Sequence, residues 1–356
     1  MIAPRAVALL ALASTAVVLT AFAQPRDEEG RFVNLDGRGA PAGLGRALKV
    51  FVWDRLTGKG GPPREGRGAP FVSPNLALLA TPPRPGEPAR VTWLGHAGFL
   101  VQLDGVSLLV DPALGPAIGP DVLGVGRIER QVPPGVPVEK LPPVDAVLVT
   151  HSHYDHLDLP TLERVGAPVV GGLGMERWCR DRHLFATELH WWETTTVRGV
   201  RVTFVPSHHW SRRTPFDTNQ LLWGGFVIQG SAATLYHSGD SAWFDGFKEI
   251  GARFPGIDAA LLPIGAYEPA AFMQTMHMSP EQALRAFGAL RARTFVAMHW
   301  GTFRLAWEPF DEPPRKLEAE RARLGIARER IRVPAVGETL VIGHGAELRG
   351  DARPPG

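Results

Sequence analysis

Short apolar runs separated by glycine and polar residues recur along the chain from about residue 90 and predict a strand-rich domain. Each run is short enough to form one buried strand, and turn-forming residues bound most of the runs. The predicted strands are residues 91–94, 99–103, 106–111, 145–150, 200–205, 221–229, 234–238, 259–264 and 294–299.

Two helices are clearest in the second half of the chain. Ser279 is a natural N-cap, Pro280 occupies the first helical position, and an apolar stripe follows on one face. The stripe consists of Leu284, Phe287 and Leu290. A second helix is predicted over residues 313–324 and ends at Gly325. Helices interspersed among strand-rich blocks predict an α/β or α+β layered fold.

The N-terminus has the pattern of an export signal. Arg5 precedes an apolar run over residues 6–21, and Ala21-Phe22-Ala23 supplies small residues at a cleavage position before Gln24. Residues 1–23 are therefore predicted to be a signal peptide, with an uncleaved membrane anchor as the alternative. We expect an exported protein, periplasmic or extracellular, and one that is membrane-associated if the segment is retained.

The next segment is rich in glycine, proline and arginine and has few periodic apolar positions. We predict an extended N-terminal arm over residues 24–88, with one short helix near 44–56. The catalytic domain is expected over residues 89–350.

Composition narrows the chemistry. The 356 residues carry 38 basic and 36 acidic side chains, a formal net charge of +2, which does not favour a nucleic-acid partner. A single cysteine, Cys179, excludes an internal disulfide and a zinc cluster built from cysteines. The 12 histidines must therefore provide any soft-metal ligands.

The most informative segment follows the strand at 145–150. It reads His151-Ser152-His153-Tyr154-Asp155-His156 and concentrates three imidazoles and one carboxylate, which are ligand types for zinc or iron. His151 and His153 alternate in an extended turn and can share one ion, while Asp155 and His156 can hold a second. The alternatives are a surface His-rich stretch and a structural zinc clip; the position after a buried-type strand argues against both.

Further candidates stand at the ends of predicted strands. They are His208 or His209, Asp240, His299 and an earlier carboxylate, Asp111. These side chains complete two metal sites if Asp240 bridges the ions. Asp111 is a candidate for holding a ligand or the histidine loop in place.

The chain resembles the metallo-β-lactamase superfamily over roughly residues 90–345. The resemblance rests on the order of four features: the His-x-His-x-Asp-His motif at 151–156, a distant His, an Asp in a Ser-Gly-Asp turn and a late His. The resemblance implies a four-layer αβ/βα sandwich with a dinuclear site at one edge between two sheets. The ligands that it implies for the first metal are His151, His153 and one of His208 or His209. Those that it implies for the second are Asp155, His156 and His299, with Asp240 shared.

A closer resemblance is to the branch of N-acyl-phosphatidylethanolamine-hydrolysing phospholipases D. It rests on short motifs outside the histidine loop: Phe32-x-Asn34-Leu35-Asp36, Trp93-Leu94-Gly95-His96-Ala97, Pro206-Ser207-His208-His209-Trp210-Ser211-x-Arg213, Pro263-Ile264-Gly265-Ala266-Tyr267, His277-Met278-Ser279-Pro280-Glu281 and His299-Trp300-Gly301. In that branch the His directly before Trp is the ligand, which selects His209 over His208.

The resemblance also suggests roles. Asp155 and Asp240 are expected to act in catalysis while binding metal, and His277 to bind the substrate phosphate or transfer a proton. Weaker candidates for substrate contact or for supporting a ligand are Asp111, His96, Arg213 and Tyr267.

These observations predict a zinc-dependent hydrolase with two Zn²⁺ ions, with iron or manganese as alternative metals. The expected activity is phosphodiester cleavage of phospholipase D type on N-acyl-phosphatidylethanolamine-like phospholipids by a zinc-bound hydroxide. A lactonase or another ester or amide hydrolase is the main alternative, and a non-catalytic binding protein is a weaker one. The expected partners are a phospholipid or other phosphodiester and a membrane surface; the oligomeric state stays open, with a homodimer as one option.

Overall fold

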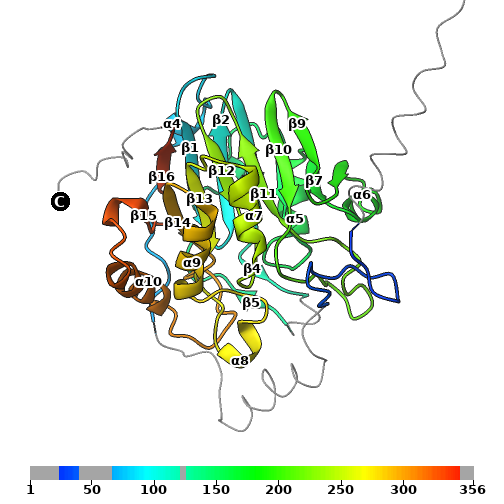
Figure 1. Cartoon of the computed structure of the whole chain (residues 1–356). Helices are drawn as coiled ribbons and strands as arrows, with labels where there is room; N and C mark the ends of the chain where they lie inside the picture. Colours follow the sequence, from blue (N-terminus) through cyan, green and yellow to red (C-terminus); the bar gives the residue numbers. More distant parts are fainter. Residues whose placement is uncertain (1–23, 40–65, 121–125, 345–356) are drawn as a thin grey trace, which may run out of the picture.

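The computed structural model describes residues 24–39, 66–120 and 126–344 (Figure 1). The predicted signal peptide at 1–23 and the helix predicted over 44–56 lie outside these residues. Within the described part of the chain, no helix has both the length and the apolar character needed to cross a membrane.

Two seven-stranded sheets form the centre of the fold. The first has the order β16-β1-β2-β3-β6-β7-β8. Its strands are β1 (Ala89–Gly95), β2 (Gly98–Leu103), β3 (Val106–Val110), β6 (Ala146–Val149), β7 (Val169–Gly172), β8 (Ala186–Leu189) and β16 (Thr339–Ile342). Neighbours are antiparallel from β16 to β3 and parallel from β3 to β8.

The second sheet has the order β15-β14-β13-β12-β11-β10-β9. Its strands are β9 (Thr194–Val197), β10 (Val200–Val205), β11 (Gly225–Gln229), β12 (Thr234–His237), β13 (Ala259–Pro263), β14 (Thr294–Met298) and β15 (Ile331–Arg332). Antiparallel pairing from β9 to β12 changes to parallel pairing from β12 to β15. A separate two-stranded ribbon pairs β4 (Ala117–Ile118) with β5 (Ile128–Glu129).

Helices cover the outer faces of both sheets. The first sheet is flanked by α4 (Leu76–Leu79), α5 (Leu159–Val165) and α6 (Met175–Arg180). On the second sheet, which faces the reader in Figure 1, lie α7 (Gly246–Arg253), α9 (Pro280–Leu290) and α10 (Glu312–Arg323), with α8 (Ala270–Met273) below them. Two short 3₁₀ turns, Val138–Lys140 and Arg328–Arg330, complete the described elements.

Two main apolar clusters hold these layers together. One fills the space between the sheets, with Trp93, Phe99 and Phe204, and continues beneath α7 and α9. The other lies between the first sheet and its helices and includes Val147 and Trp178. Because the central strands of each sheet are buried on both faces, they read as near-continuous apolar runs rather than as alternating patterns. The predicted four-layer sandwich is confirmed.

Helix α9 begins as its sequence predicts. The Ser279 hydroxyl accepts from the Gln282 backbone N–H, and the Gln282 side chain accepts from the Ser279 N–H, which forms a capping box. Pro280 occupies the first turn, where no backbone donor is needed.

The strand predicted over 221–229 is shorter than expected, because β11 starts only at Gly225. The Leu222 N–H instead donates to Leu173 O at 2.9 Å. A Cβ at Gly172 would lie 2.3 Å from Leu222 O, so this contact between the two sheets requires glycine. The close backbone approach takes the start of the predicted strand out of the sheet.

Several chain segments that carry polar candidates leave the sheets at one edge of the sandwich. The β1–β2 turn carries His96. Asp111 follows β3, the loop at 151–156 follows β6, His209 follows β10, Asp240 follows β12 and His299 follows β14. Residues that are far apart in sequence therefore meet at one end of the inter-sheet core.

Candidate metal centre

Asp111 fixes the histidine loop at both ends. One carboxylate oxygen, Oδ1, accepts from the Thr150 N–H at 2.8 Å. The other, Oδ2, accepts from the Thr150 hydroxyl at 2.7 Å and lies 2.7 Å from His156 Nδ1. The carboxylate is completely buried. Its bond to Nδ1 leaves His156 Nε2 directed at the cluster, as expected for a residue that orients a metal ligand.

Three imidazole nitrogens meet at the first cluster. His151 Nε2 lies 2.9 Å from His153 Nδ1, which lies 3.2 Å from His209 Nε2. Burial lowers the pKa of all three rings, to about 3 for His153 and His209, so that they are neutral at pH 7. His209 Nδ1 donates to Met276 O at 2.9 Å, which leaves the lone pair on Nε2. Lone pairs this close to one another fit a shared cation.

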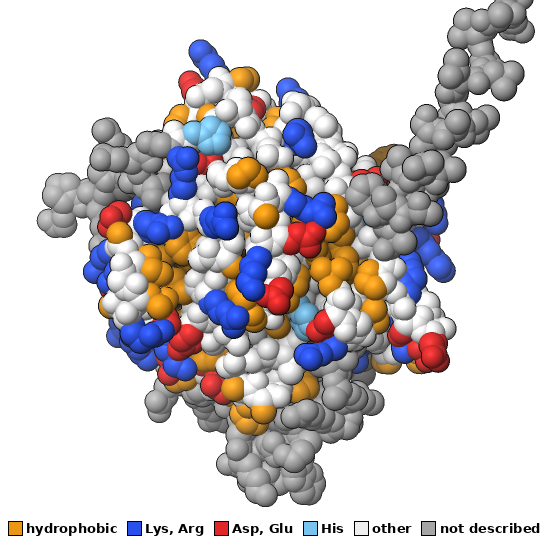
Figure 2. Space-filling view, in the orientation of Figure 1, with side chains coloured by type: hydrophobic (Ala, Val, Ile, Leu, Met, Phe, Trp, Pro, Cys, Tyr) orange, Lys and Arg blue, Asp and Glu red, His pale blue; other side chains and the backbone are white. Residues whose placement is uncertain are grey.

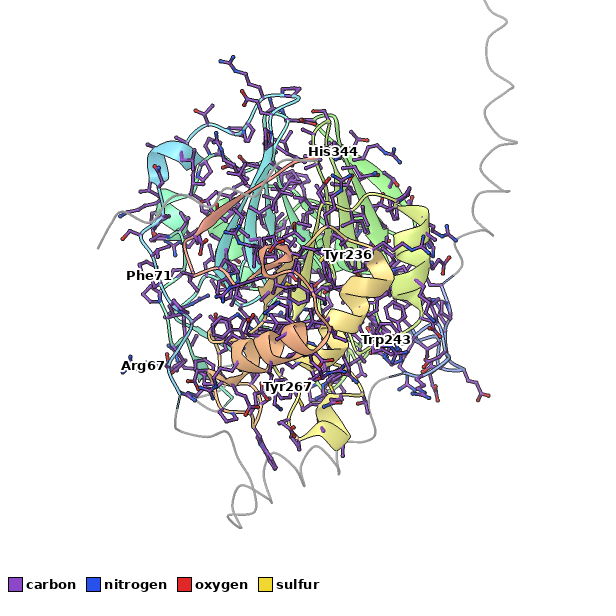
Figure 3. The ribbon with its side chains drawn as sticks, turned by 60° about the vertical axis from the view of Figure 1, so that its left-hand side comes forward. Arg67, Phe71, Tyr236, Trp243, Tyr267 and His344 are labelled. Carbon is purple, nitrogen blue, oxygen red and sulfur yellow. The ribbon has the colours of Figure 1, made fainter. Side chains whose placement is uncertain are left out.

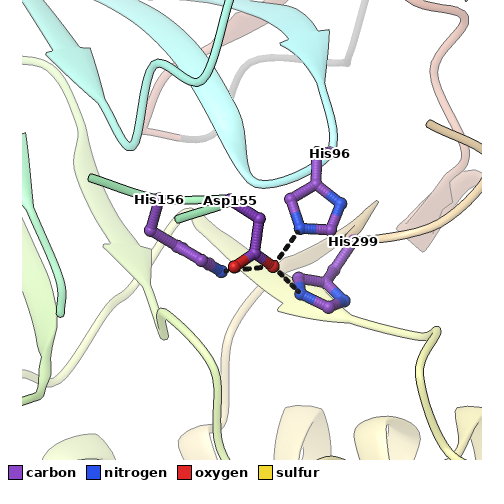
Figure 4. Close-up of side chains that lie close together, drawn as sticks. All are labelled: His96, Asp155, His156 and His299. Atoms are coloured by element: carbon purple, nitrogen blue, oxygen red, sulfur yellow. Dashed lines mark hydrogen bonds and ion pairs between the residues drawn. The ribbon is translucent and has the colours of Figure 1, made fainter. Parts of the chain in front are cut away.

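The second cluster contains Asp155, His156, His299 and His96 (Figure 4). Asp155 Oδ2 lies 2.8 Å from His96 Nε2 and 3.6 Å from Nε2 of both His156 and His299. His96 thus supports the carboxylate from the β1–β2 turn. The His299 ring lies beside it, with ring centres 3.9 Å apart, and His156 approaches from the opposite side (Figure 4).

Asp240 contacts both clusters. Its Oδ1 lies 3.1 Å from His299 Nε2, and its Oδ2 lies 3.3 Å from His156 Nε2. The same Oδ2 lies 3.8 Å from His209 Nε2 and 4.0 Å from His151 Nε2. A carboxylate in this position can bind two ions at once.

The electrostatics differ between the two clusters. Although burial opposes ionisation, the surrounding imidazoles hold the pKa of Asp155 and Asp240 well below the usual range. Burial would lower the pKa of His299, but Asp240 and Asp155 outweigh it and raise this pKa to about 9. The pKa of His156 is also raised, because the nearby carboxylates outweigh its burial. Without metal, the second cluster therefore holds protons that the first does not.

Orphaned buried atoms test whether these residues fit a metal. Among the described residues, His156 Nε2, His299 Nε2 and Asp240 Oδ1 are buried and make no hydrogen bond of good geometry. All three point at the same small volume and are nitrogen and oxygen ligands of the type that zinc binds. Buried polar atoms seldom lack partners, so the residues fit a metal centre. The lone Cys179 is buried in α6 and takes no part.

His277 lies at the rim of both clusters. Its Nδ1 is 3.7 Å from Asp240 Oδ2, and its ring centre lies 5.2 Å from that of His209. Burial lowers its pKa to about 4. The structure brings this predicted residue within reach of the same carboxylate that joins the clusters.

Other predicted residues lie elsewhere. His208 turns away from the clusters, and its Nε2 lies 3.1 Å from Asp36 Oδ2. Arg213 donates to Ser152 O and Leu157 O, so it supports the histidine loop from behind instead of facing the clusters.

Tyr267 is directed away from the clusters as well. Its hydroxyl donates to Glu312 Oε1 at 2.6 Å, beside α10 (Figure 3). The sequence suggested a role for Tyr267 because it lies close to the end of a predicted strand. In the structure its side chain packs against α10 instead.

Sequence reasoning missed two supporting groups. The Met276 carbonyl fixes the tautomer of His209, and a backbone carbonyl leaves no side-chain signal in the sequence. His237 accepts from the Gly239 N–H at 3.1 Å and bonds to Ala97 O at 2.9 Å, which steadies the turn before Asp240. Its position three residues before Asp240 was the available clue.

The chain is similar to proteins of one family. A family profile described as a beta-lactamase superfamily domain matches residues 107–300. An uncharacterized protein of Mycobacterium tuberculosis is 36% identical over 315 residues, which cover 83% of this chain and 79% of that protein. The N-acyl-phosphatidylethanolamine-hydrolyzing phospholipase D 1 of Caenorhabditis elegans is 34% identical over 244 residues, 64% of this chain and 68% of that enzyme.

A solved structure extends the comparison. The metallo hydrolase Igni18 from the archaeon Ignicoccus hospitalis matches with a TM-score of 0.52 and 25% identity, covering 70% of this chain and 97% of that one. The chain therefore belongs to the metallo-β-lactamase superfamily of metal-dependent hydrolases, in the branch that contains the N-acyl-phosphatidylethanolamine-hydrolysing phospholipases D.

Proposed function

We propose that this chain is a phosphodiesterase of phospholipase D type that binds two zinc ions and cleaves N-acyl-phosphatidylethanolamine-like phospholipids. The observation that carries the proposal is Asp240, whose two carboxylate oxygens contact both histidine clusters. The relative from Caenorhabditis elegans, which bears the name of this activity, supports the substrate class.

The residues divide the metal-binding task. His151, His153 and His209 would hold one ion, Asp155, His156 and His299 the other, and Asp240 both. When bound, two zinc ions supply positive charge for the phosphate oxygens and lower the pKa of water toward neutrality. The carboxylates of Asp155 and Asp240 accept hydrogen bonds at the cluster and orient a water molecule there.

His277 is placed to act on the substrate. With a pKa of about 4 it is neutral at pH 7, so it donates an N–H to a phosphate oxygen without carrying charge. An anionic phosphate beside it would raise this pKa, so that the ring takes up a proton from solvent and, as imidazolium, gives it to the leaving alkoxide. Phosphate binding and proton donation are therefore successive roles of one ring.

A groove beside His208 has room for part of a lipid and offers about 540 Å³. Its wall combines apolar and charged side chains: Leu35, Trp243 and Phe244 with Asp36, Arg38, Asp245 and Glu249. His208, next in sequence to His209, lies in its wall. This volume is within the roughly 300–1,000 Å³ of small-molecule sites.

The distribution of charge on the surface indicates which class of partner the protein suits. On the face in Figure 2, basic and acidic side chains are interspersed with apolar ones. Interspersed charge suits a lipid partner better than a nucleic acid, whose phosphates attract a continuous basic stripe.

Metal content tests the centre directly. Purified protein should carry two metal ions. His209→Ala should lower the affinity for one of them by more than about 100-fold, because loss of a group that only supports a ligand already costs up to about that much. His208→Ala is the matched control, because its ring faces Asp36, and it should retain both ions. Elemental analysis after dialysis reports the ions; equal metal loss in both variants would contradict the assignment of His209.

The pH dependence of metal binding should differ between the ions. In the metal-free protein the pKa of His299 is raised to about 9, and that of His156 is also raised by the nearby carboxylates. An ion bound there must therefore release their protons. Affinity at this cluster should rise with pH toward about 9. The first cluster is already neutral above about pH 5 and should bind without proton release. Calorimetry in buffers of different ionisation enthalpy counts the protons; identical release for both ions would contradict these pKa shifts.

His277 separates a phosphodiesterase from a generic metal hydrolase. His277→Ala should retain both metals, while turnover of a phosphodiester with a poor alkoxide leaving group falls by roughly 10²–10⁴. An activated aryl phosphodiester should lose little, because its leaving group needs no proton. Equal losses on both substrates would indicate phosphate binding alone, and normal turnover on the poor leaving group would remove His277 from the mechanism.

A screen of the zinc-loaded protein tests the bond that is cleaved. N-acyl-phosphatidylethanolamine should be hydrolysed in preference to lactones, amide substrates and β-lactams. Preferential lactone hydrolysis would overturn the phosphodiesterase proposal and leave the metal centre standing.

A further inference from the structure

The N-terminal arm over residues 24–39 reaches the segment that presents His209. Asn34 Nδ2 donates to His209 O at 2.9 Å, and Asn34 Oδ1 accepts from the His209 N–H at 3.0 Å. The two residues are 175 positions apart in sequence. One amide side chain thus pairs with both backbone groups of His209, as a neighbouring strand would.

This pairing is buried and reinforced. Asn34 and His209 are each only 2% exposed. Trp223 Nε1 donates to the same Asn34 oxygen at 3.0 Å, which fixes the orientation of the amide. Among the described residues, the His209 N–H and carbonyl have no hydrogen-bond partner other than Asn34. Loss of the amide would leave a buried donor and acceptor unpaired, and the segment would have to shift.

A shift there would affect the first cluster. The His209 ring is held at Nδ1 by the Met276 carbonyl, and its Nε2 lies 3.2 Å from His153 Nδ1. The ring direction depends on where the His209 backbone sits, and Asn34 bonds to both of its backbone groups. The preceding residue, His208, is held separately by Ser241 and Ala242. A supporting group of this kind normally acts on ligand position and metal affinity.

We propose that Asn34 is a positioning residue for metal binding, through which the N-terminal arm completes the cluster of His151, His153 and His209. The proposal rests on the metal centre of the proposed function, and it is independent of the substrate. The asparagine amide suits the task because its NH₂ group donates to the His209 carbonyl while its oxygen accepts from the His209 N–H. An aspartate would keep the acceptor, lose the donor and place a negative charge against the His209 carbonyl.

The chain provides a matched control in Asn219, which is 3% exposed. Its Nδ2 donates to Phe32 O at 3.0 Å, and its Oδ1 accepts from the Ser211 N–H at 3.1 Å. Asn219 therefore ties the same arm to the same segment, two residues beyond His209, but does not touch His209.

The experiment compares Asn34→Ala with Asn219→Ala in the full chain. Both should lower the melting temperature of the metal-free protein, since both loosen the arm. Only Asn34→Ala should lower the affinity for one of the two zinc ions, by about 10–100-fold as measured by competition with a chelator. Wild-type affinity for both ions in Asn34→Ala, or equal weakening in Asn219→Ala, would overturn the role of Asn34.

Hydrogen exchange of the metal-free protein gives a second readout. The His209 amide should exchange faster in Asn34→Ala than in Asn219→Ala. In Asn34→Asp, which keeps the acceptor, this amide should stay protected while zinc affinity still falls. The outcome for Asn34→Asp also stands if Asn34→Ala does not fold. Wild-type protein that binds no zinc would instead reject the proposed metal centre, while the exchange result would still report on the contact.

Discussion

The burial of two carboxylates among imidazoles at one edge of the sandwich is the constraint on which the site depends. Asp155 and Asp240 are ionised in a volume where burial alone would favour their neutral forms. Ionised carboxylates persist in such surroundings only when positive charge neutralises them. Protonated His156 and His299 supply that charge in the metal-free protein, and metal ions would replace those protons.

The fold provides this arrangement by ending many strands at the same edge. Asp111 at the end of β3 holds the loop after β6, and Met276 before α9 fixes the ring that follows β10. Each ligand position therefore depends on elements from different parts of the sequence. The inter-sheet core makes these elements rigid, because its large side chains are completely buried.

The sequence predicted much of this candidate site because its residues lie in the segments that follow apolar strands. Strand ends at Val149, Val205, His237 and Met298 place the polar residues that come next at one edge. Asp111 was recognisable for the same reason. The fold class followed from the resemblance and from the alternation of strands and helices.

Other features depend on contacts that no local pattern encodes. The residue types at 208 and 209 are identical, so only the motif resemblance selected His209. In the structure the partners distinguish the rings: His208 Nε2 faces Asp36, and His209 Nδ1 bonds to the Met276 carbonyl. The first residues of the strand predicted at 221–229 are not in the sheet, because the backbone at Leu222 lies against Gly172 of the other sheet. Helix α6 has six residues and no clear apolar stripe, so periodicity did not reveal it.

The central claim is that two ions share Asp240. Anomalous diffraction at the zinc edge, from crystals of the protein purified with its metal, tests it most directly. The account predicts two peaks, one beside His151, His153 and His209 and the other beside Asp155, His156 and His299, with the Asp240 carboxylate between them. A single peak, or two peaks of which one is remote from Asp240, would contradict it.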